Sequence, residues 1–273
     1  CLHMKDMGIE INYHHPEVAA SGQFEIEPQL GVMSKMADAT MMIKYIIHNT
    51  ALKYGKTATF MPKPIYGEAG SGMHVHMILF KDGKPVFADD AGYAGLSETA
   101  HYFIGGLLKH IGSLCAITNP STNSFKRLVP GYEAPVYIAW SAKNRSPLVR
   151  IPTARGSGTR IELRNPDPAA NPYLAFAAVL QAGLDGIEKG MTPPAPADSN
   201  IFELTRDERQ EAGIHSLPKT LYDALREFRK SDFAKMAVGE HVHKKYIAAK
   251  TEEWTEYTTR VSQWEIDKYL GKY

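Results

Sequence analysis

Two glutamates near the start of this 273-residue chain have the spacing of a divalent-cation site. Glu17 and Glu25 flank a stretch of small residues, 19–22, that can form a turn. If the hairpin turns at Ser21, the two side chains lie directly opposite each other with Cβ atoms roughly 5 Å apart. Carboxylates this close repel each other unless a proton or a hard cation lies between them. The alternative is a solvated hairpin with two unrelated acids.

A second segment with chemical potential is residues 70–76, which read GSGMHVH. On a strand, His74 and His76 share one face. The glycines before them let the backbone come close to a ligand. The segment is not a Walker A loop, because no Gly-Lys-Ser/Thr follows it. A His-x-His pair alone is weak evidence for a site, and we expect the similar pair His241 and His243 to be surface residues without a role.

The third segment is residues 159–164, TRIELR. Strand alternation puts Arg160, Glu162 and Arg164 on one face and the two aliphatic residues on the other. Arginine forks match carboxylate and phosphate oxygens, so an anion site is one reading of this face. An exposed ladder of ion pairs explains the pattern equally well and would contribute little to stability.

The fourth segment, residues 119–150, is long and weakly regular, and such loops are often functional. It carries Arg127, Arg145 and Arg150 against a single acid, Glu133. Prolines on both sides of Glu133 are typical of a loop that moves but keeps its shape. A basic surface loop is the alternative.

Together, the four segments supply an oxygen-rich set of possible metal ligands with one imidazole: Glu17, Glu25, Glu162 and His74. This set suits Mg²⁺ or Mn²⁺ better than structural zinc. Five arginines supply anion sites: Arg127, Arg145, Arg150, Arg160 and Arg164. Metal ions combined with arginines are the components of phosphoryl transfer, where catalysis is mostly positioning and charge neutralisation.

The elements that must position these side chains follow from hydrophobic periodicity and from turn signals. Strands are predicted over residues 9–17, 23–28, 72–80, 148–152 and 159–164. Helices are predicted over 34–54, 97–118, 172–189 and beyond 216, with breaks near Ser231 and Gly239. Strands and helices are segregated and do not alternate regularly. We therefore predict an α+β fold, an antiparallel sheet with helices packed on one side.

Composition excludes several functional classes. Lys and Arg number 31 and Asp and Glu number 30, so the net charge is +1 and neither nucleic acid nor a membrane is expected as a partner. Two cysteines, Cys1 and Cys115, are too few for a disulfide framework, and we expect a reduced, cytoplasmic location. The most apolar helical stretch, 102–117, is too short and too polar to span a bilayer.

The same segments resemble glutamine synthetase of the bacterial type I class. The motifs that carry the resemblance are HHPE at 14–17, GQFE at 22–25, GSGMHVH at 70–76, KRLVPGYEAP at 126–135, NRS at 144–146 and RIELRNPDPAANPY at 160–173. The resemblance implies the catalytic portion of a glutamate–ammonia ligase. Such an enzyme uses ATP to join ammonia to L-glutamate, giving L-glutamine through γ-glutamyl phosphate, and it forms a homo-oligomer of two stacked hexameric rings, a dodecamer.

The resemblance also implies roles for individual residues. It assigns Glu17 and Glu25 to one metal ion, and His74 and Glu162 to a second. The glutamate-binding positions that it implies are Gly70, Arg127, Glu133, Arg145 and Arg164. The ATP-binding positions that it implies are His76, Arg145, Arg150 and Arg160. Catalytic roles fall to Arg145 and Arg160 at the transferring phosphoryl group and to Glu133, which closes the site and helps to deprotonate ammonium.

Departures from the family pattern leave alternatives open. An earlier Glu-x-Glu pair of metal ligands and a small N-terminal β domain are not found, so we expect residues 1–273 to be the catalytic domain without its N-terminal part, with incomplete metal sites. Ala69 replaces an Asn, Ile78 replaces a Ser, and Phe202 replaces a tyrosine that some members adenylylate. An amine or a polyamine could replace ammonia as the acceptor. The isolated chain could also be an inactive fragment that binds nucleotide and metal.

Overall fold

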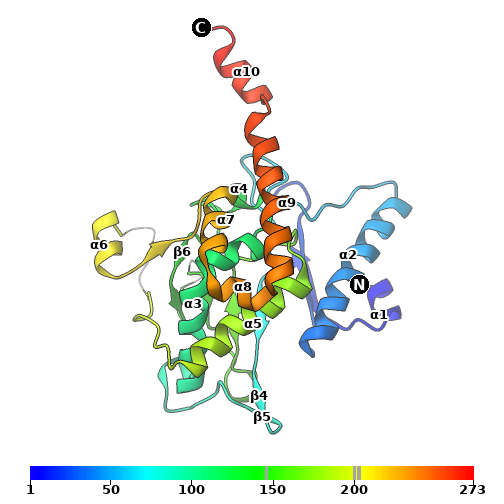
Figure 1. Ribbon diagram of the computed structural model, residues 1–273. Coiled ribbons are helices and arrows are strands. Elements are labelled where there is room, and N and C mark those ends of the chain that lie inside the picture. Colours follow the sequence, from blue (N-terminus) through cyan, green and yellow to red (C-terminus); the bar gives the residue numbers. More distant parts are fainter. Residues whose placement is uncertain (145–146, 199–200, 202–203) are drawn as a thin grey trace.

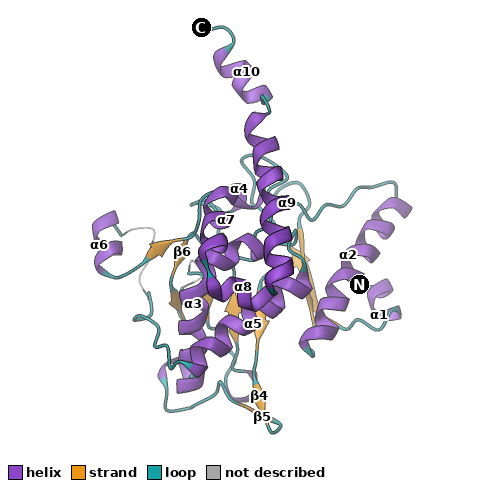
Figure 2. Ribbon diagram, in the orientation of Figure 1, coloured by secondary structure: helices purple, strands orange, loops and turns teal. Residues whose placement is uncertain are grey.

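The computed structural model describes residues 1–144, 147–198, 201 and 204–273 (Figures 1 and 2). Arg145 and Phe202, both singled out from the sequence, lie outside the described residues. Strands and helices form separate layers, which confirms the predicted α+β class. In the part of the chain that the structure describes, no helix is both long enough and apolar enough to cross a membrane.

A four-stranded sheet lies at the centre, in the order β3-β9-β8-β7. Its strands are β3 (Val75–Met77), β9 (Ile161–Leu163), β8 (Val149–Arg150) and β7 (Trp140–Ser141). β9 is antiparallel to both of its neighbours, as predicted, but β7 and β8 are parallel. The sheet is therefore mostly, not wholly, antiparallel. Ile161 and Leu163 on β9 are fully buried in the main core.

Helices form the layer over this sheet and contain most of the core. They are α3 (Glu98–Thr118), α5 (Pro172–Glu188), α7 (Leu221–Lys230), α8 (Asp232–Val238) and α9 (Glu240–Thr259). Ser97 caps α3 and Asn171 caps α5, as side-chain oxygens at helix starts do. α3 and α5 approach so closely that a Cβ on Gly106 would lie 2.0 Å from the Ala182 carbonyl oxygen. Glycine is therefore required at that crossing.

The first hairpin, β1 (Ile11–Pro16) and β2 (Phe24–Pro28), stands beside α1 (Leu2–Asp6) and α2 (Met33–Lys53). Its register corrects the predicted one. His15, not Glu17, is opposite Glu25, and the Glu17 N–H bonds to the Gln23 carbonyl at 2.9 Å. The turn is therefore centred one residue earlier than Ser21. Gly22, with φ +90°, supplies the left-handed backbone that leads into β2.

Shorter elements complete the fold: α4 (Ser124–Arg127), α6 (Arg206–Glu211), α10 (Gln263–Tyr269), β4 (Phe80–Lys81), β5 (Lys84–Pro85), β6 (Tyr137–Ile138) and β10 (His215–Ser216), with 3-10 turns η1 (Tyr93–Gly95) and η2 (Gly156–Gly158). β4 and β5 form a short antiparallel hairpin, with Phe80 opposite Pro85. α10 projects from the end of α9, away from the body (Figure 1).

Two predictions made from the sequence were wrong in detail. The strand predicted over 72–80 is not continuous. β3 begins only at Val75, because the Ser71 and Met73 N–H groups donate to the carbonyls of Pro62 and Pro166 in other loops, and Phe80 belongs to β4. His243, predicted at the surface, is 8% exposed and bonds to the Phe228 carbonyl at 3.0 Å. It packs where α9 covers α7, so it is a core histidine.

Candidate functional site

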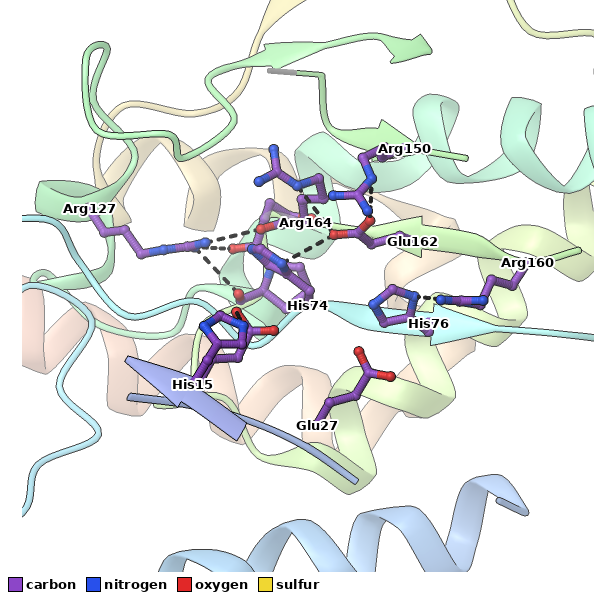
Figure 3. Close-up of polar contacts among 12 residues, drawn as sticks. His15, Glu27, His74, His76, Arg127, Arg150, Arg160, Glu162 and Arg164 are labelled. Atoms are coloured by element: carbon purple, nitrogen blue, oxygen red, sulfur yellow. Dashed lines mark hydrogen bonds and ion pairs between the residues drawn. The ribbon is translucent and has the colours of Figure 1, made fainter. Parts of the chain in front are cut away.

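Glu162 is the centre of a row of charged and polar side chains across the sheet (Figure 3). The register of β3, β9 and β8 places His76 on one side of Glu162 and Arg150 on the other. Cross-strand partners point to the same face, so all three side chains emerge together. The Glu162 oxygens lie 3.0 Å from Arg150 Nε and 3.3 Å from Arg164 Nε. A single buried carboxylate thus joins two guanidinium groups.

His74 approaches the same carboxylate from the end of β3, with its Nδ1 atom 3.2 Å from Glu162 Oε1. Burial alone would raise the pKa of Glu162, but the His74 hydrogen bond and the charges of His74, His76 and Arg150 lower it to about 2. Burial of the His74 ring, together with the charges of Arg164 and Arg127, lowers its pKa to about 4. The hydrogen bond and charge of Glu162 raise this pKa but do not offset the lowering. At neutral pH Glu162 is an anion and His74 is uncharged.

The hydrogen-bond pattern assigns the tautomer of His74. A neutral ring that donates its Nδ1 hydrogen to Glu162 has no hydrogen on Nε2. An unprotonated imidazole nitrogen whose ring is oriented by a carboxylate is the usual arrangement of a metal-binding histidine. The His74 side chain is 31% exposed, so a ligand can reach it from outside.

Arg160 occupies a different position from the other two charges of its segment. Its Nε donates to His76 Nδ1 at 3.2 Å, whereas Glu162 pairs with Arg150 and Arg164. His76 is therefore held as a neutral acceptor, and burial lowers its pKa further from the usual value. Arg160, Glu162 and Arg164 thus belong to one region, but Arg160 pairs with His76 and Arg164 pairs with Glu162.

Arg164 is 5% exposed, and part of its guanidinium group has no hydrogen-bond acceptor within the described chain. Its Nη1 atom is buried and has no hydrogen-bond partner among the residues that the structure describes. A buried donor without an acceptor costs stability, so such a group usually marks a missing ligand or water. A carboxylate or phosphate oxygen is the acceptor that fits a guanidinium group best.

Arg127 lies behind the glycine loop, 3% exposed. Its guanidinium group donates to main-chain carbonyls, from Nη1 to Asn165 at 2.7 Å and from Nη2 to Arg164 at 3.1 Å. A Cβ on Gly70 would lie 2.9 Å from Arg127 Cγ, and one on Gly72 would lie 2.5 Å from Nη2. The glycines are needed because the loop rests directly on this arginine.

The hairpin contributes a second, acidic cluster made of His15, Glu17 and Glu25. One ligand atom from each of these residues lies within 4.8 Å of the others. His15 Nδ1 is 3.6 Å from a Glu17 oxygen, and His15 Nε2 is 4.0 Å from a Glu25 oxygen. Burial and the neighbouring Glu17 carboxylate raise the pKa of Glu25. Two carboxylates and an imidazole that converge in this way fit a divalent cation, which would relieve the repulsion.

Within the described residues, this is the only group of three potential metal ligands. The structure therefore brings Glu17 and Glu25 together despite the corrected register. It also brings His74 and Glu162 together, but adds no third acidic or histidine ligand from the described chain to that pair. The metal-binding roles of all four residues stay predictions.

Two residues of this region were missed by sequence reasoning, His15 and Glu27. Glu27 lies below His76 in Figure 3 and influences its pKa. It accepts a hydrogen bond from Tyr13, which raises the pKa of that phenol to about 12. The signal was the alternation of residues 13, 15 and 17 with 25 and 27, which puts all five on one face of the hairpin.

Hydrogen bonds tie the hairpin to the glycine loop. Gln23 Nε2 donates to the Gly70 carbonyl at 3.0 Å, and the Ala20 N–H donates to a Glu68 carboxylate oxygen at 3.0 Å. The acidic cluster and the Glu162 row therefore belong to one site, built from segments far apart in the sequence (Figure 3).

Glu133 lies on an exposed loop at the edge of this site. Its φ of +60° is in the left-handed region, which is unusual for a residue with a side chain. Its charge raises the pKa of Arg164, against the lowering effect of burial, so the two residues are near each other. Arg145, predicted to act beside them, lies outside the described residues.

Comparisons with known proteins identify relatives of the whole chain. The family model described as "Glutamine synthetase, catalytic domain" matches residues 1–269. A glutamine synthetase of Clostridium saccharobutylicum is 53% identical over 272 residues, covering 100% of this chain and 61% of that protein. One from Methanosarcina mazei is 54% identical, covering 98% of this chain and 60% of that protein. The chain thus spans about three-fifths of these relatives' length.

Solved structures agree with the sequence relatives. A structure titled "GmaS/ADP complex" superposes with a TM-score of 0.90 at 34% identity, covering 99% of this chain and 62% of that one. A cryo-electron microscopy structure of Plasmodium falciparum glutamine synthetase has a TM-score of 0.88 at 28% identity, covering 98% of this chain and 60% of that one. The separate strand and helix layers therefore form a known catalytic-domain fold.

Proposed function

The chain belongs to the glutamine synthetase catalytic-domain family, and from that premise we propose that the whole protein is an ATP-dependent glutamate–ammonia ligase. It forms L-glutamine from L-glutamate and ammonium through γ-glutamyl phosphate. The observation that carries the proposal is the row of His74, Glu162, Arg150 and Arg164. This row supplies fixed positive charge and an unpartnered donor on Arg164, beside an acidic cluster that suits a metal ion. These groups suit anionic substrates that react with each other.

In the proposed first step, the γ-carboxylate of glutamate attacks the terminal phosphorus of ATP and ADP leaves. Arg150, Arg160 and Arg145 bind phosphate oxygens and offset the charge that spreads over them in the transition state. His76 contacts the nucleotide and is oriented by Arg160. This step needs positive charge held in place before substrate arrives, and the ion pair with Glu162 holds Arg150 in this way.

The glutamate pocket is proposed to contain Gly70, Arg127, Glu133, Arg145 and Arg164. The free Nη1 donor of Arg164 supports a contact with a substrate carboxylate. Arg127 Nη2 lies beside Gly72, so the glycine loop and this arginine form one wall. In the second step ammonia attacks the acyl phosphate carbon and phosphate leaves. Glu133 accepts the proton that ammonium loses.

Two divalent ions, Mg²⁺ or Mn²⁺, are proposed as cofactors. Glu17 and Glu25, joined by His15, would hold one, and the converging ligand atoms of this cluster fit it. His74 and Glu162 would hold the other, since His74 presents an unprotonated Nε2. Such ions neutralise phosphate charge and orient the transferring group. ATP, L-glutamate and ammonium would be the partners, in a homo-oligomer that we propose is a dodecamer.

The function is tested with the complete gene product that contains these residues. Glutamine and phosphate are measured with ATP, glutamate, Mg²⁺ and either ammonium, methylamine or putrescine. We expect equal amounts of glutamine and phosphate with ammonium. Preference for an amine would instead establish the alternative γ-glutamyl ligase. No glutamate-dependent phosphate with any acceptor would overturn the proposal.

The 273-residue chain alone provides a second comparison. We expect it to bind ADP weakly in the presence of Mn²⁺ but to show little synthetase activity, because it spans only about three-fifths of its relatives' length. Calorimetry with ADP and Mn²⁺ measures the first property, and glutamate-dependent phosphate release measures the second. Robust turnover by the chain alone would show that its ligand set is sufficient.

A further inference from the structure

Lys63 is a buried cation that the proposed chemistry does not use. It is 9% exposed, in the loop before the glycine segment. Its Nζ lies 3.7 Å from the centre of the Tyr132 ring and also donates a hydrogen bond to the Glu68 carbonyl. Among the described residues, no ion pair with a carboxylate involves Lys63. The Tyr132 ring and the Glu68 carbonyl are therefore the groups that this ammonium contacts, and cation–π contacts are strongest where water is excluded.

The main chain of Lys63 is fixed as firmly as its side chain. Asn123 Oδ1 accepts from the Lys63 N–H at 2.7 Å, and Asn123 Nδ2 donates to the Lys63 carbonyl at 3.0 Å. Asn123 immediately precedes α4, the short helix that carries Arg127. Lys63 is thus attached to the wall of the proposed glutamate pocket, and its ammonium group is a fixed point of the site.

Tyr132, the partner of Lys63, belongs to the loop that carries Glu133. Leu128 and Ala134, at the two ends of this loop, are 8% and 5% exposed, so both ends are anchored in the core. Between them, Gly131 has φ +91° and Glu133 has φ +60°. Side chains tolerate such angles only where the surroundings enforce them. In the described structure, the Tyr132–Lys63 contact is a tertiary contact of the loop tip that can provide this restraint.

We propose that Lys63 is a positioning residue that holds the Glu133 loop closed over the site by binding the face of Tyr132. This inference rests on the proposed function and adds to it a contact that controls how the loop closes. γ-Glutamyl phosphate can lose phosphate in two ways. Attack by ammonia forms the C–N bond of glutamine, and the proton goes to Glu133. Attack by water forms a C–O bond and regenerates glutamate. A loop held closed excludes water and so sets the ratio between the two outcomes.

The test measures that ratio in the complete gene product. Lys63→Met keeps the length of the side chain and removes the charge, and Tyr132→Leu removes the ring. Each is expected to reduce loop closure roughly 5- to 30-fold, the range for a desolvated cation–π contact. Phosphate release that depends on glutamate should then exceed glutamine formation, whereas wild type forms the two in equal amounts. The double variant should be no more uncoupled than either single variant, because both remove the same contact.

Two matched controls separate this role from general damage. Tyr132→Phe keeps the ring and should stay coupled. Lys250→Met removes a lysine of α9 that lies 5.9 Å from the Tyr246 ring and pairs with Glu253, and it should also stay coupled. Equal glutamine and phosphate in Lys63→Met, or effects of the two single variants that multiply in the double variant, would overturn the proposal.

A second measurement does not depend on catalysis. Glu133 is exposed, so a glutamate-specific protease can cut the loop there when it opens. Cleavage after Glu133, identified by mass spectrometry, should be roughly 5- to 30-fold faster in Lys63→Met than in Tyr132→Phe. Faster cleavage in a protein that forms no glutamine would leave the contact established and only the proposed function refuted. Unchanged cleavage in Lys63→Met overturns the positioning role whatever the enzyme makes.

Discussion

The two halves of the site treat a glutamate in opposite ways. On the sheet, Glu162 is surrounded by Arg150, Arg164 and His74, and its pKa falls to about 2. On the hairpin, Glu25 faces Glu17, and its pKa is raised. Both residues are acids on short strands with alternating patterns. The difference is whether the protein itself supplies the compensating positive charge.

This contrast separates a carboxylate that protein cations already stabilise from a pair of carboxylates that repel each other. The Glu162 row is ordered before a metal ion or substrate binds, as suits groups that must meet a reacting phosphate. The hairpin cluster is strained electrostatically and becomes favourable when a cation neutralises it. Variants of the two halves should therefore differ in stability, in response to metal and in response to pH.

The largest expected effect is that of Glu162→Ala. Removing this carboxylate leaves the guanidinium groups of Arg150 and Arg164 without their anion, and breaking a buried ion pair from one side costs about 3–5 kcal/mol. We expect that loss in the free energy of unfolding, measured with urea and without metal, together with loss of glutamine formation. Near-normal turnover would contradict the assigned role of Glu162.

Glu25→Ala is the matched substitution on the hairpin. It removes one of two repelling carboxylates that are partly exposed. Without metal, its free energy of unfolding should stay within about 1 kcal/mol of wild type, as for surface substitutions. A loss as large as that of Glu162→Ala would erase the distinction between the two halves.

Bound metal should affect the hairpin cluster more than the Glu162 row. A ligand that binds only the folded state at 100 times its Kd adds about 2.7 kcal/mol of stability. We expect Mn²⁺ to raise the Tm of wild type, and to raise it much less in Glu17→Gln and Glu25→Gln. Glu252→Gln, on the exposed side of α9, is the control and should respond like wild type. An undiminished Mn²⁺ response in Glu25→Gln would remove Glu25 from the metal site.

The two glutamates should also give pH dependences of opposite sign. The lowered pKa of Glu162 means that its contribution is present above its ordinary value of 4.5 and is lost as the pH falls toward about 2. The raised pKa of Glu25 means that its carboxyl favours the folded state at low pH, and that this contribution is lost as the pH rises through the raised value.

Urea unfolding of metal-free protein between pH 3 and 7 measures this difference, in steps of about one pH unit. Relative to wild type, Glu25→Gln should become more stable as the pH rises, whereas Glu162→Gln should become less stable. Parallel curves for the two variants would show that their environments are alike.

The smallest expected effect belongs to the rim of the hairpin. Tyr13→Phe removes the hydrogen bond to Glu27, and Tyr13 is 47% exposed. We expect a loss of about 0.5–1 kcal/mol in the free energy of unfolding, the range for a single hydrogen bond. A larger loss would mean that the hairpin is held together mainly by this contact and not by the main-chain hydrogen bonds between β1 and β2.

Much of the fold was predictable because its signals are local. The helices predicted over 34–54, 97–118 and 172–189 begin and end within a residue or two of α2, α3 and α5. The short strands were harder. β3 begins late because neighbouring loops take the hydrogen bonds of Ser71 and Met73, and no pattern within 72–80 reveals those distant partners. The burial of His243 likewise depends on α7.

For the site, residue types were predictable and partners were not. Alternation correctly put Glu162 and Arg164 on one face, but the pairing of Arg160 with His76 required the register of β3 against β9. His15 was overlooked because a one-residue error in the turn placed Glu17 where His15 stands. The contact of Lys63 with Tyr132 joins two loops, and loop geometry is not encoded in periodicity.

The glycine loop also imposes a steric constraint that is separate from any contact with substrate. A Cβ on Gly70 would lie 2.5 Å from the Pro62 carbonyl oxygen and 2.9 Å from Arg127 Cγ, and one on Gly72 would lie 2.5 Å from Arg127 Nη2. A saturation scan of this protein would therefore record both positions as intolerant even to alanine. Their intolerance would look catalytic in such data, although its origin is steric. Pairing the Gly72 substitution with a shortened residue 127, and measuring the free energy of unfolding, would distinguish the two causes.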